Sequence, residues 1–79
     1  MKITKHAFQD LIQMEREAQI AKWGHQEHPD EKWGMILLEE AGEVAKAVLE
    51  KNDAALLEEM VQVAAVLEAW ITSRQCTPA

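Results

Sequence analysis

Apolar residues recur with the period of an α-helix over the first quarter of the chain. Thr4 is a suitable N-cap residue, and Ile3 before it can pack against Phe8 as a hydrophobic staple. This pattern predicts a first helix over about residues 4–22. Its apolar stripe consists of Phe8, Leu11, Ile12, Met14, Ala18 and Ala21. Beside the stripe lies a polar line, the usual pattern of a solvated face, formed by Glu15, Gln19 and Lys22, with Arg16 adjacent.

A second periodic run, over about residues 31–51, continues without a helix breaker. One of its lines is uniformly apolar and contains Trp33, Leu37, Ala41, Val44 and Val48. The neighbouring line begins with Ile36 and ends with Ala47, but Glu40 and Glu43 interrupt it. Both acids are therefore predicted to lie on a face that would otherwise be buried. Charges on a buried helix face are costly unless they are paired or bound to a cation.

Asn52 and Asp53 predict a tight reversal of the chain after the second run. We expect Asn52 to take the left-handed conformation that ends a helix, and Asp53 to cap the next helix. A connection this short makes the two helices an antiparallel pair.

The third predicted helix, over about residues 54–73, is the most apolar part of the chain. Between Met60 and Ile71 only Gln62 and Glu68 are polar. A helix that is apolar nearly all round is buried, and in so short a chain we expect burial against another subunit. Residues 72–79 are expected to form a frayed tail.

Composition sets the size of the domain. The 79 residues allow one domain, and 48% of them are hydrophobic, so the chain is expected to fold. A core of this size rarely stabilises a fold alone. We therefore predict a single all-α domain over residues 1–79. It consists of an antiparallel helical hairpin plus an N-terminal helix, completed to a four-helix-type bundle by homo-oligomerisation as a dimer or tetramer.

The charge of the chain restricts its partners. The formal net charge is −6, which argues against a nucleic-acid polymer or an anionic membrane as partner. An anionic ligand such as a nucleotide would need a divalent cation between it and the protein. One cysteine, Cys76, excludes an internal disulfide, and we see neither a signal peptide nor an apolar run long enough to span a membrane. These features predict a cytoplasmic protein.

The segment from Trp23 to Asp30 is the only predicted loop of any length. Gly24 can end the first helix, and Pro29 fits the first turn of the second unless Asp30 caps it. Trp23 and Trp33 bracket this loop and two histidines lie between them. Either both tryptophans wedge the corner between helices, or a planar ring such as a base stacks there.

Helix geometry predicts that two pairs of side chains, three carboxyl groups and one amide in all, meet across the hairpin. Glu40 and Glu43 are three residues apart and share one face, and Glu59 and Gln62 repeat that spacing on the third helix. Across the predicted turn the midpoints of the two pairs are offset by about 3 residues, or roughly 4.5 Å along the axis. Packed helices lie about 8–10 Å apart, so the four side chains can converge on one point.

Three carboxylates and an amide carbonyl suit a hard cation, Mg²⁺ or Mn²⁺. The four positions include no His or Cys, which argues against zinc. The alternative is that such acids lie on solvated faces, as we expect for Glu39, Glu50 and Glu58. We favour the metal site because both pairs are matched across a tight hairpin and are set in apolar surroundings.

These motifs resemble those of a known family. Glu39-Glu40-Ala41-Gly42-Glu43 and Glu59-Met60-Val61-Gln62 resemble the EExxE…ExxD signature of the MazG-like all-α nucleoside triphosphate pyrophosphohydrolases. The segment from Glu15 to Gly24, followed by His28-Pro29, is similar to a MazG-like subgroup of phage and bacterial genomes, and the resemblance covers about residues 8–72.

The resemblance implies an activity and a set of roles. Mg²⁺ would be held by Glu40, Glu43 and Glu59 and would bridge the phosphates of a nucleoside or deoxynucleoside triphosphate. Water would then attack to release pyrophosphate and a monophosphate. Glu39 would orient that water, although a solvated position is an equal alternative. Contacts with the nucleotide would come from Trp23 and His28 near the base, with Gln19 and Lys22 as lesser contacts to base or phosphate.

Two departures from the family pattern leave the activity open. Gln62 stands where the family has Asp; an amide can offer a carbonyl oxygen to the metal but adds no charge and cannot act as a base. Many relatives also have a fourth helix and, beyond it, a basic segment that contacts phosphate. In this sequence Arg74 is the only basic residue after Lys51. Either another subunit completes the site or activity is weak. The alternatives are a catalytically inactive nucleotide- or metal-binding module and a purely structural helical oligomerisation domain.

Overall fold

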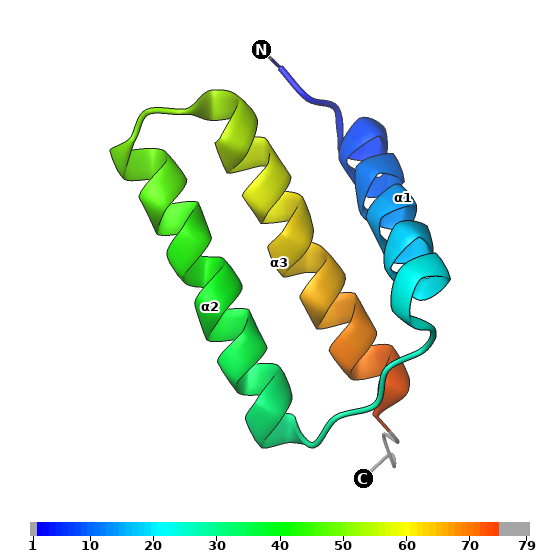
Figure 1. Ribbon diagram of the computed structural model, residues 1–79. Coiled ribbons are helices and arrows are strands. Elements are labelled where there is room, and N and C mark those ends of the chain that lie inside the picture. The colour runs from blue at the N-terminus through cyan, green and yellow to red at the C-terminus, as the bar shows by residue number, and fades with distance from the viewer. Residues whose placement is uncertain (1, 75–79) are drawn as a thin grey trace, which may run out of the picture.

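The computed structural model describes residues 2–74. Within that span the chain forms three α-helices and no strand: α1 (Lys5–Trp23), α2 (Asp30–Leu49) and α3 (Asp53–Ser73). Figure 1 shows α2 and α3 side by side as an antiparallel hairpin, with α1 on the far side of α3. The predicted all-α fold is confirmed for this chain, and each helix boundary agrees with its prediction within two residues. Completion of a bundle by a second copy stays a prediction, and Cys76 and most of the predicted tail lie outside the described residues.

The ends of α1 follow the sequence signals. Thr4 Oγ1 accepts a hydrogen bond from the backbone N–H of Ala7 at 3.1 Å, which confirms Thr4 as the N-cap. Gly24 ends the helix with a φ of 72°, and its N–H donates to the carbonyl of Ile20 at 2.8 Å. Residues with a Cβ rarely adopt that φ, so glycine suits this helix end.

The turn between α2 and α3 differs from its prediction. Lys51, not Asn52, takes the left-handed conformation, with a φ of 53°. Asn52 is the N-cap of α3, because its side-chain oxygen accepts the backbone N–H of Ala55 at 3.0 Å. That role needs extended backbone at Asn52, which excludes the left-handed position. Asp53 therefore begins the helix, where its negative charge interacts favourably with the positive end of the helix dipole.

The start of α2 also departs from both predicted arrangements. Pro29 precedes the helix in extended conformation and Asp30 is the first helical residue, without a side-chain cap. The Asp30 carboxylate instead reaches α3, where it accepts hydrogen bonds from Trp70 Nε1 at 2.8 Å and from Arg74 Nε at 3.1 Å. These bonds fasten the open end of the hairpin.

The core lies in the seam between α2 and α3. Trp33, Val66 and Ala69 are buried together there, with partly buried hydrophobic residues packed around them, namely Ile36, Leu37 and Trp70. Farther along the same two helices the buried side chains are small or β-branched: Ala47, Val61 and Ala65. Small residues allow two helix backbones to approach closely.

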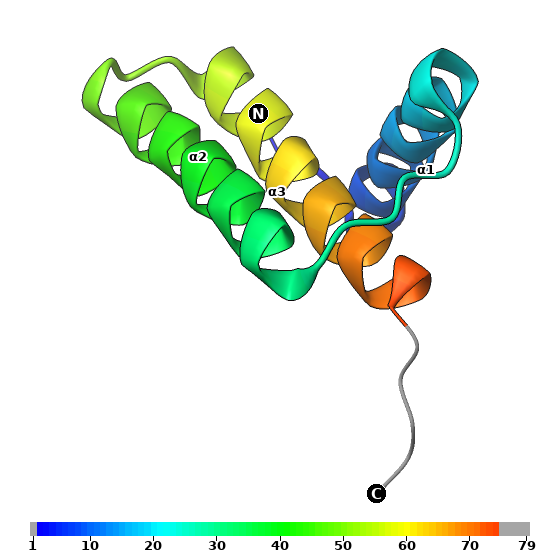
Figure 2. The same ribbon diagram turned by 60° about the horizontal axis from the view of Figure 1, so that its bottom comes forward.

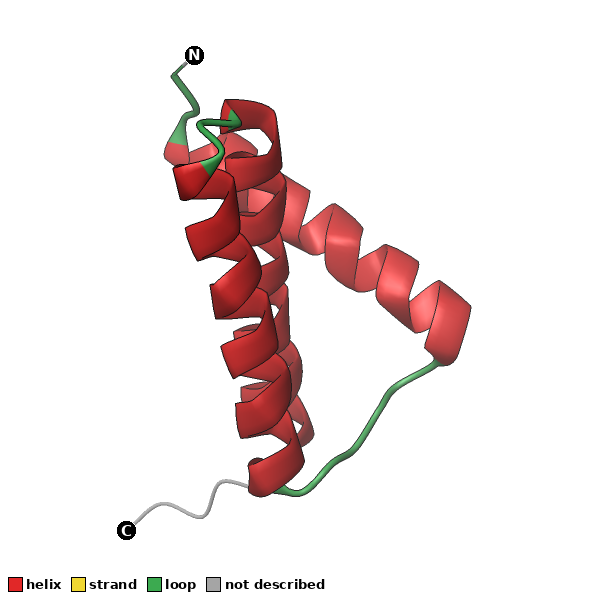
Figure 3. Cartoon of the chain, turned by 60° about the vertical axis from the view of Figure 1, so that its left-hand side comes forward, coloured by secondary structure: helices red, strands yellow, loops and turns green. Residues whose placement is uncertain are grey.

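Helix α1 is attached to the hairpin through α3 alone. Among the described residues α1 packs against α3 and makes no packing contact with α2. Figures 2 and 3 show α1 beginning near α3 and diverging from the hairpin toward its C-terminal end, with the connection to α2 running back across the opening. The divergence leaves room for a pocket on the side of α3 that faces α1.

The predicted orientation of α1 is correct only for its first half. Leu11 and Ile12 are half-buried as expected, but Met14 is 62% exposed and Ala18 and Ala21 are exposed. The polar residues Glu15, Arg16 and Gln19 are half-buried and face α3, so the solvated-face interpretation is wrong for them. The reason is that α3 offers polar partners at that level, namely Gln62 and Glu68. Lys22 is exposed as that interpretation requires.

A considerable part of the apolar surface stays exposed in the single chain. Met60, Leu67 and Ile71 of α3 are between 45% and 57% exposed. Met35 and Leu38 of α2 are exposed by about two thirds. Burial of α3 against a second subunit stays a prediction. In the part of the chain that the structure describes, no helix has the length and apolar character needed to cross a membrane.

Candidate functional site

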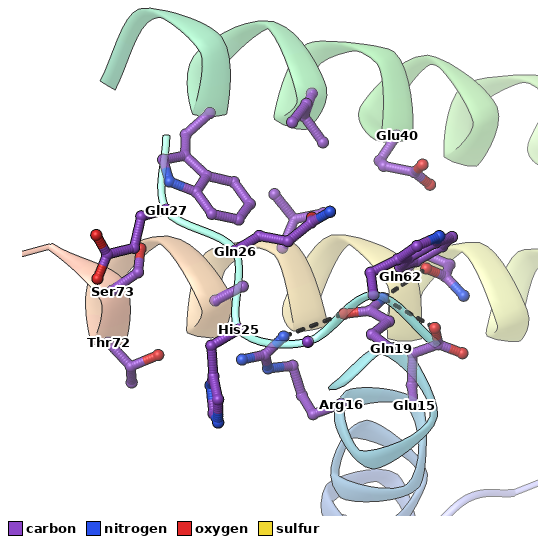
Figure 4. Close-up of a pocket in the computed structure, with 16 residues that line it drawn as sticks. Glu15, Arg16, Gln19, His25, Gln26, Glu27, Glu40, Gln62, Thr72 and Ser73 are labelled. Carbon is purple, nitrogen blue, oxygen red and sulfur yellow. Dashed lines mark hydrogen bonds between the residues drawn. The ribbon is translucent and has the colours of Figure 1, made fainter. Parts of the chain in front are cut away.

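A pocket of about 490 Å³ lies where the three helices and the α1–α2 loop meet (Figure 4). This volume is in the range of pockets that hold small molecules. Its polar wall combines residues of all three helices, namely Glu15, Arg16, Gln19, Glu40 and Gln62. Its other walls come from Trp23, Trp33, Ile36, Val66 and the loop residues 24–27. The pocket therefore has an aromatic and apolar side next to a side rich in carboxyl and amide groups.

Glu40 and Glu59 meet across the seam between α2 and α3. Both side chains are half-buried, and the Glu59 carboxyl group is close enough to that of Glu40 to affect its pKa both by charge and by hydrogen bonding. Burial raises the pKa of Glu40 above its usual value, and the negative charges of Glu59, Glu39 and Glu43 raise it further. Two carboxyl groups in contact cannot both ionise without repulsion, so this position favours either a shared proton or a bound cation.

The four predicted metal ligands differ in their position relative to the pocket. Glu40 and Gln62 line the pocket, and Glu59 contacts Glu40 from α3. Glu43 is exposed, yet it is near enough to Glu40 to raise its pKa. Within residues 2–74 no three His, Cys, Asp or Glu side chains stand arranged as a metal-binding cluster.

The donor chemistry nevertheless fits a hard cation. The groups that raise the pKa of Glu40, namely the carboxyl groups of Glu59, Glu39 and Glu43, all offer oxygen, and their crowding is relieved by a positive charge. The sequence-based assignment of Glu40, Glu43, Glu59 and Gln62 as ligands therefore stays a prediction. Glu39 is exposed on α2, which agrees with either of its predicted interpretations.

A polar network connects α1 to the pocket wall on α3. Arg16 Nη1 donates to Gln19 Oε1 at 3.2 Å, and Gln19 Nε2 donates to Glu15 Oε2 at 2.8 Å. Gln19 Nε2 also donates to Gln62 Oε1 at 3.4 Å. Arg16 Nε is buried and lies 3.5 Å from a carboxylate oxygen of Glu68, which makes an ion pair without a well-formed hydrogen bond. This network holds the C-terminal half of α1 beside Gln62.

The two tryptophans that bracket the loop have different roles. Trp33 is 4% exposed and belongs to the core, where the His28 ring packs against it at a centroid distance of 4.8 Å. The corner-wedge interpretation therefore holds for Trp33. Trp23 is 57% exposed at the pocket wall, and the Lys22 ammonium lies 4.7 Å above its ring. Trp33 Nε1 is buried and has no hydrogen-bond partner among the described residues.

The structure brings only part of the predicted nucleotide contacts to the pocket. Trp23 and Gln19 line it. His28 and Lys22 are not among its lining residues: His28 packs against Trp33, and Lys22 lies over the Trp23 ring. Sequence reasoning missed Glu15 and Arg16 as site residues. The available signal was the spacing of Glu15 and Gln19, which are four residues apart and share one face of the helix. The solvated-face interpretation explained this spacing without a site.

No protein-family model, curated protein or solved structure matches the chain. The MazG-like resemblance therefore rests on the acidic and aromatic motifs named above.

Proposed function

We propose that this protein is a Mg²⁺-dependent hydrolase of the MazG-like type that converts a nucleoside or deoxynucleoside triphosphate into a monophosphate and pyrophosphate. The observation that carries the proposal is the contact between the Glu40 and Glu59 carboxyl groups at the wall of a pocket with an aromatic side. In this arrangement the carboxyl pair holds the cation and the pocket holds the nucleotide.

The charges around the pocket support a metal-bound ligand. The lining contains the acids Glu15, Glu27 and Glu40 and a single guanidinium, Arg16, which is already paired with Glu68. A bare triphosphate would be repelled by such a wall. Bound at Glu40 and Glu59, Mg²⁺ would neutralise phosphate charge and lower the pKa of a bound water. We assign the orientation of the attacking water to Glu39, which lies next to Glu40 on α2.

The dimensions of the pocket support the assignment of its two ends. Trp33 and Glu40 both line it from α2, and they are seven residues apart in sequence, which is two helical turns or roughly 10 Å. This separation suits a phosphate group at Glu40 and a planar base at the aromatic end. Trp23, exposed at the pocket wall, can stack on that base.

The exposed apolar residues support a homo-oligomer. The chain leaves Met60, Leu67 and Ile71 of α3 uncovered, although α3 is its most apolar helix. A second copy packed there would complete a four-helix-type bundle. The acidic charge and the low cysteine content support a protein of the reducing cytoplasm.

A non-catalytic nucleotide-binding module is the second candidate function. The observation that favours it is Gln62, an amide that cannot act as a base, at the position where the family signature has Asp. If this candidate is correct, nucleotides bind without hydrolysis, and the substitution Gln62→Asp creates activity.

The proposal is tested by incubating the protein with a panel of nucleoside and deoxynucleoside triphosphates and measuring pyrophosphate release with and without Mg²⁺. We expect metal-dependent release from at least one nucleotide. Glu40→Gln and Glu59→Gln should each reduce it by about 100-fold or more, since a metal ion contributes several kcal/mol of charge stabilisation. Glu58→Gln, which alters an exposed neighbour on α3, is the matched control and should retain activity. No release from any nucleotide at high protein concentration contradicts the proposal.

A further inference from the structure

The side chains of α1 determine how the amide of Gln19 is oriented. Arg16 can only donate hydrogen bonds, so the Gln19 atom 3.2 Å from its Nη1 is the carbonyl oxygen. A carboxylate accepts hydrogen bonds, so the Gln19 atom 2.8 Å from Glu15 Oε2 is the amide nitrogen. Exchanging the two atoms would place donor against donor and acceptor against acceptor. The orientation of Gln19 is therefore set by a charged partner on each side.

Gln19 in turn sets the orientation of Gln62 on α3. The second hydrogen of Gln19 Nε2 points to Gln62 Oε1 at 3.4 Å, a long hydrogen bond, whereas the reversed amide would bring two nitrogens together. The Gln62 carbonyl oxygen is thus turned toward α1 (dashed lines in Figure 4). Its Nε2 forms no hydrogen bond with any residue that the structure describes. Gln62 consequently brings an unused N–H donor to the wall of the pocket.

The residue that carries this donor is a neighbour of the proposed cation site along α3. Gln62 is one helical turn, roughly 4.5 Å along the axis, beyond Glu59, whose carboxyl group contacts Glu40. The single guanidinium of the pocket wall is engaged by Gln19 and Glu68. An anion held at the carboxyl pair through a cation would therefore find an uncharged N–H donor next to it.

We propose that Gln62 donates its amide N–H to a phosphate oxygen of the bound nucleotide, and that Glu15, Arg16 and Gln19 are positioning residues that hold the amide in this orientation. The inference rests on the proposed function, because it requires a nucleotide in the pocket. It differs from the expected role of Gln62 as a metal ligand, because the carbonyl oxygen accepts the N–H of Gln19 and the amide N–H is the group without a protein partner. A carboxylate at this position would present an acceptor to the phosphate, so Gln62→Asp should weaken nucleotide binding.

The contact can be observed in the unaltered protein by nuclear magnetic resonance of the glutamine side-chain amides. The probes are Mg²⁺ alone, Mg²⁺ with inorganic tripolyphosphate, and Mg²⁺ with α,β-imido analogues of the deoxynucleoside triphosphates. We expect the Gln62 amide signals to move with tripolyphosphate and with a nucleotide analogue, and to move little with Mg²⁺ alone. Gln13, whose amide donates to Glu17 at 3.0 Å on the exposed side of α1, is the internal control.

Binding measurements on variants separate phosphate contact from metal ligation. Gln62→Met should lower affinity for Mg²⁺-tripolyphosphate and for the Mg²⁺-nucleotide about 10-fold or more, while affinity for Mg²⁺ alone changes less than about twofold. Gln19→Met should produce part of this loss, and should cause little further loss when combined with Gln62→Met, as coupled residues do. Gln13→Met is the matched control for α1.

Three other outcomes would each contradict the inference for a different reason. An equal loss of affinity for Mg²⁺ alone in Gln62→Met means that the carbonyl oxygen is a metal ligand. Unchanged affinity for tripolyphosphate and nucleotide in Gln62→Met, with Gln62 signals that do not move, means that the amide makes no phosphate contact although the proposed function stands. If no signal of the protein moves with any nucleotide analogue, the proposed function itself fails, and the role of Gln62 with it.

Discussion

Glu40 is a half-buried acid on α2 whose carboxyl group lies against that of Glu59. Burial first, and then the charges of Glu59, Glu39 and Glu43, raise its pKa above the usual range. The folded state therefore holds the Glu40 proton more tightly than the unfolded state does. The stability that this proton contributes is present in full below the usual glutamate pKa and is lost as pH rises through the raised pKa. At neutral pH and without a cation, the carboxyl pair weakens the fold.

Glu40→Gln is expected to raise the melting temperature of the metal-free protein at neutral pH, because the amide removes the buried negative charge. As pH rises from below the usual glutamate pKa through the raised pKa of Glu40, the wild-type melting temperature should fall relative to that of the variant. Mg²⁺ should stabilise the wild type and have little effect on Glu40→Gln. Circular-dichroism melting over this pH range, with and without Mg²⁺, is the measurement. A variant that is less stable than the wild type at every pH would show that Glu40 serves packing rather than charge.

Asp30 has the opposite behaviour. The hydrogen bond from Trp70, and then that from Arg74, lower the pKa of Asp30 below its usual value. The stability that Asp30 contributes is therefore present above the usual aspartate pKa and lost as pH falls through the lowered pKa.

Asp30→Asn should lower the melting temperature at pH 7, and in acid the melting temperatures of the variant and the wild type should converge. Asp10→Asn, at an exposed position within α1, is the control and should have little effect at either pH. An identical difference for Asp30→Asn at pH 7 and in strong acid would contradict the charge-based account.

At the scale of the elements, the hairpin and α1 differ in how they are held. The buried side chains of the described chain belong to α2 and α3, and α1 contributes none that is fully buried. α1 is held by half-buried apolar residues such as Leu11 and Ile12 and by the polar network around Arg16. Because one wall of the pocket belongs to α1, the site is completed by the least firmly packed helix.

We expect α1 to open before the hairpin unfolds. Amide hydrogen exchange should give lower opening free energies for α1 than for the buried segments of α2 and α3, since few apolar contacts hold α1. Arg16→Met should lower the values of α1 further, because it leaves Glu68 without its ion pair. Gln13→Met, on the exposed side of α1, is the matched control. Equal opening free energies in α1 and α3 would mean that the three helices unfold as one unit.

The sequence predicts the hairpin better than it predicts the wall of the site. The apolar lines of residues 31–51 and 54–73 and the short turn determine an antiparallel pair, and the contact of Glu40 with Glu59 follows from their register. The orientation of α1 could not be predicted in this way. Polarity marks Glu15, Arg16 and Gln19 as solvated, and only the partners that α3 provides, Gln62 and Glu68, turn them inward.

The turn and the loop show the same limit at a smaller scale. Asn52 has side-chain chemistry for two neighbouring roles, the left-handed position and the N-cap, and the bond to Ala55 decides between them. Trp23 and Trp33 are the same residue type and bracket the same loop, yet Trp23 is exposed and Trp33 is buried. Local propensity leaves such alternatives open, and packing with distant residues decides them.

At the scale of the whole molecule, the exposed apolar face of α3 predicts association of the chain with itself. Met60, Leu67 and Ile71 are spaced by seven and four residues, so they share one side of the helix. A face of this kind on so small a domain is the expected site of contact between copies.

Sedimentation velocity is expected to give a dimer or tetramer for the wild type. Leu67→Glu and Ile71→Glu should each shift the protein toward the monomer, because a charge at the interface would lose its hydration. Met14→Glu, at an exposed apolar position on α1, is the control and should leave the assembly unchanged. A wild-type protein that sediments as a monomer at high concentration contradicts the predicted oligomer.

The most direct test of the account is a titration of the protein with Mn²⁺, followed by the electron paramagnetic resonance of the free ion, in the presence of a non-hydrolysable nucleoside triphosphate. The account predicts that the wild type and Glu58→Gln bind Mn²⁺ with the nucleotide, and that Glu40→Gln and Glu59→Gln lose this binding. Mn²⁺ binding that is equal in all four proteins would contradict the claim that the Glu40–Glu59 pair is a cation site.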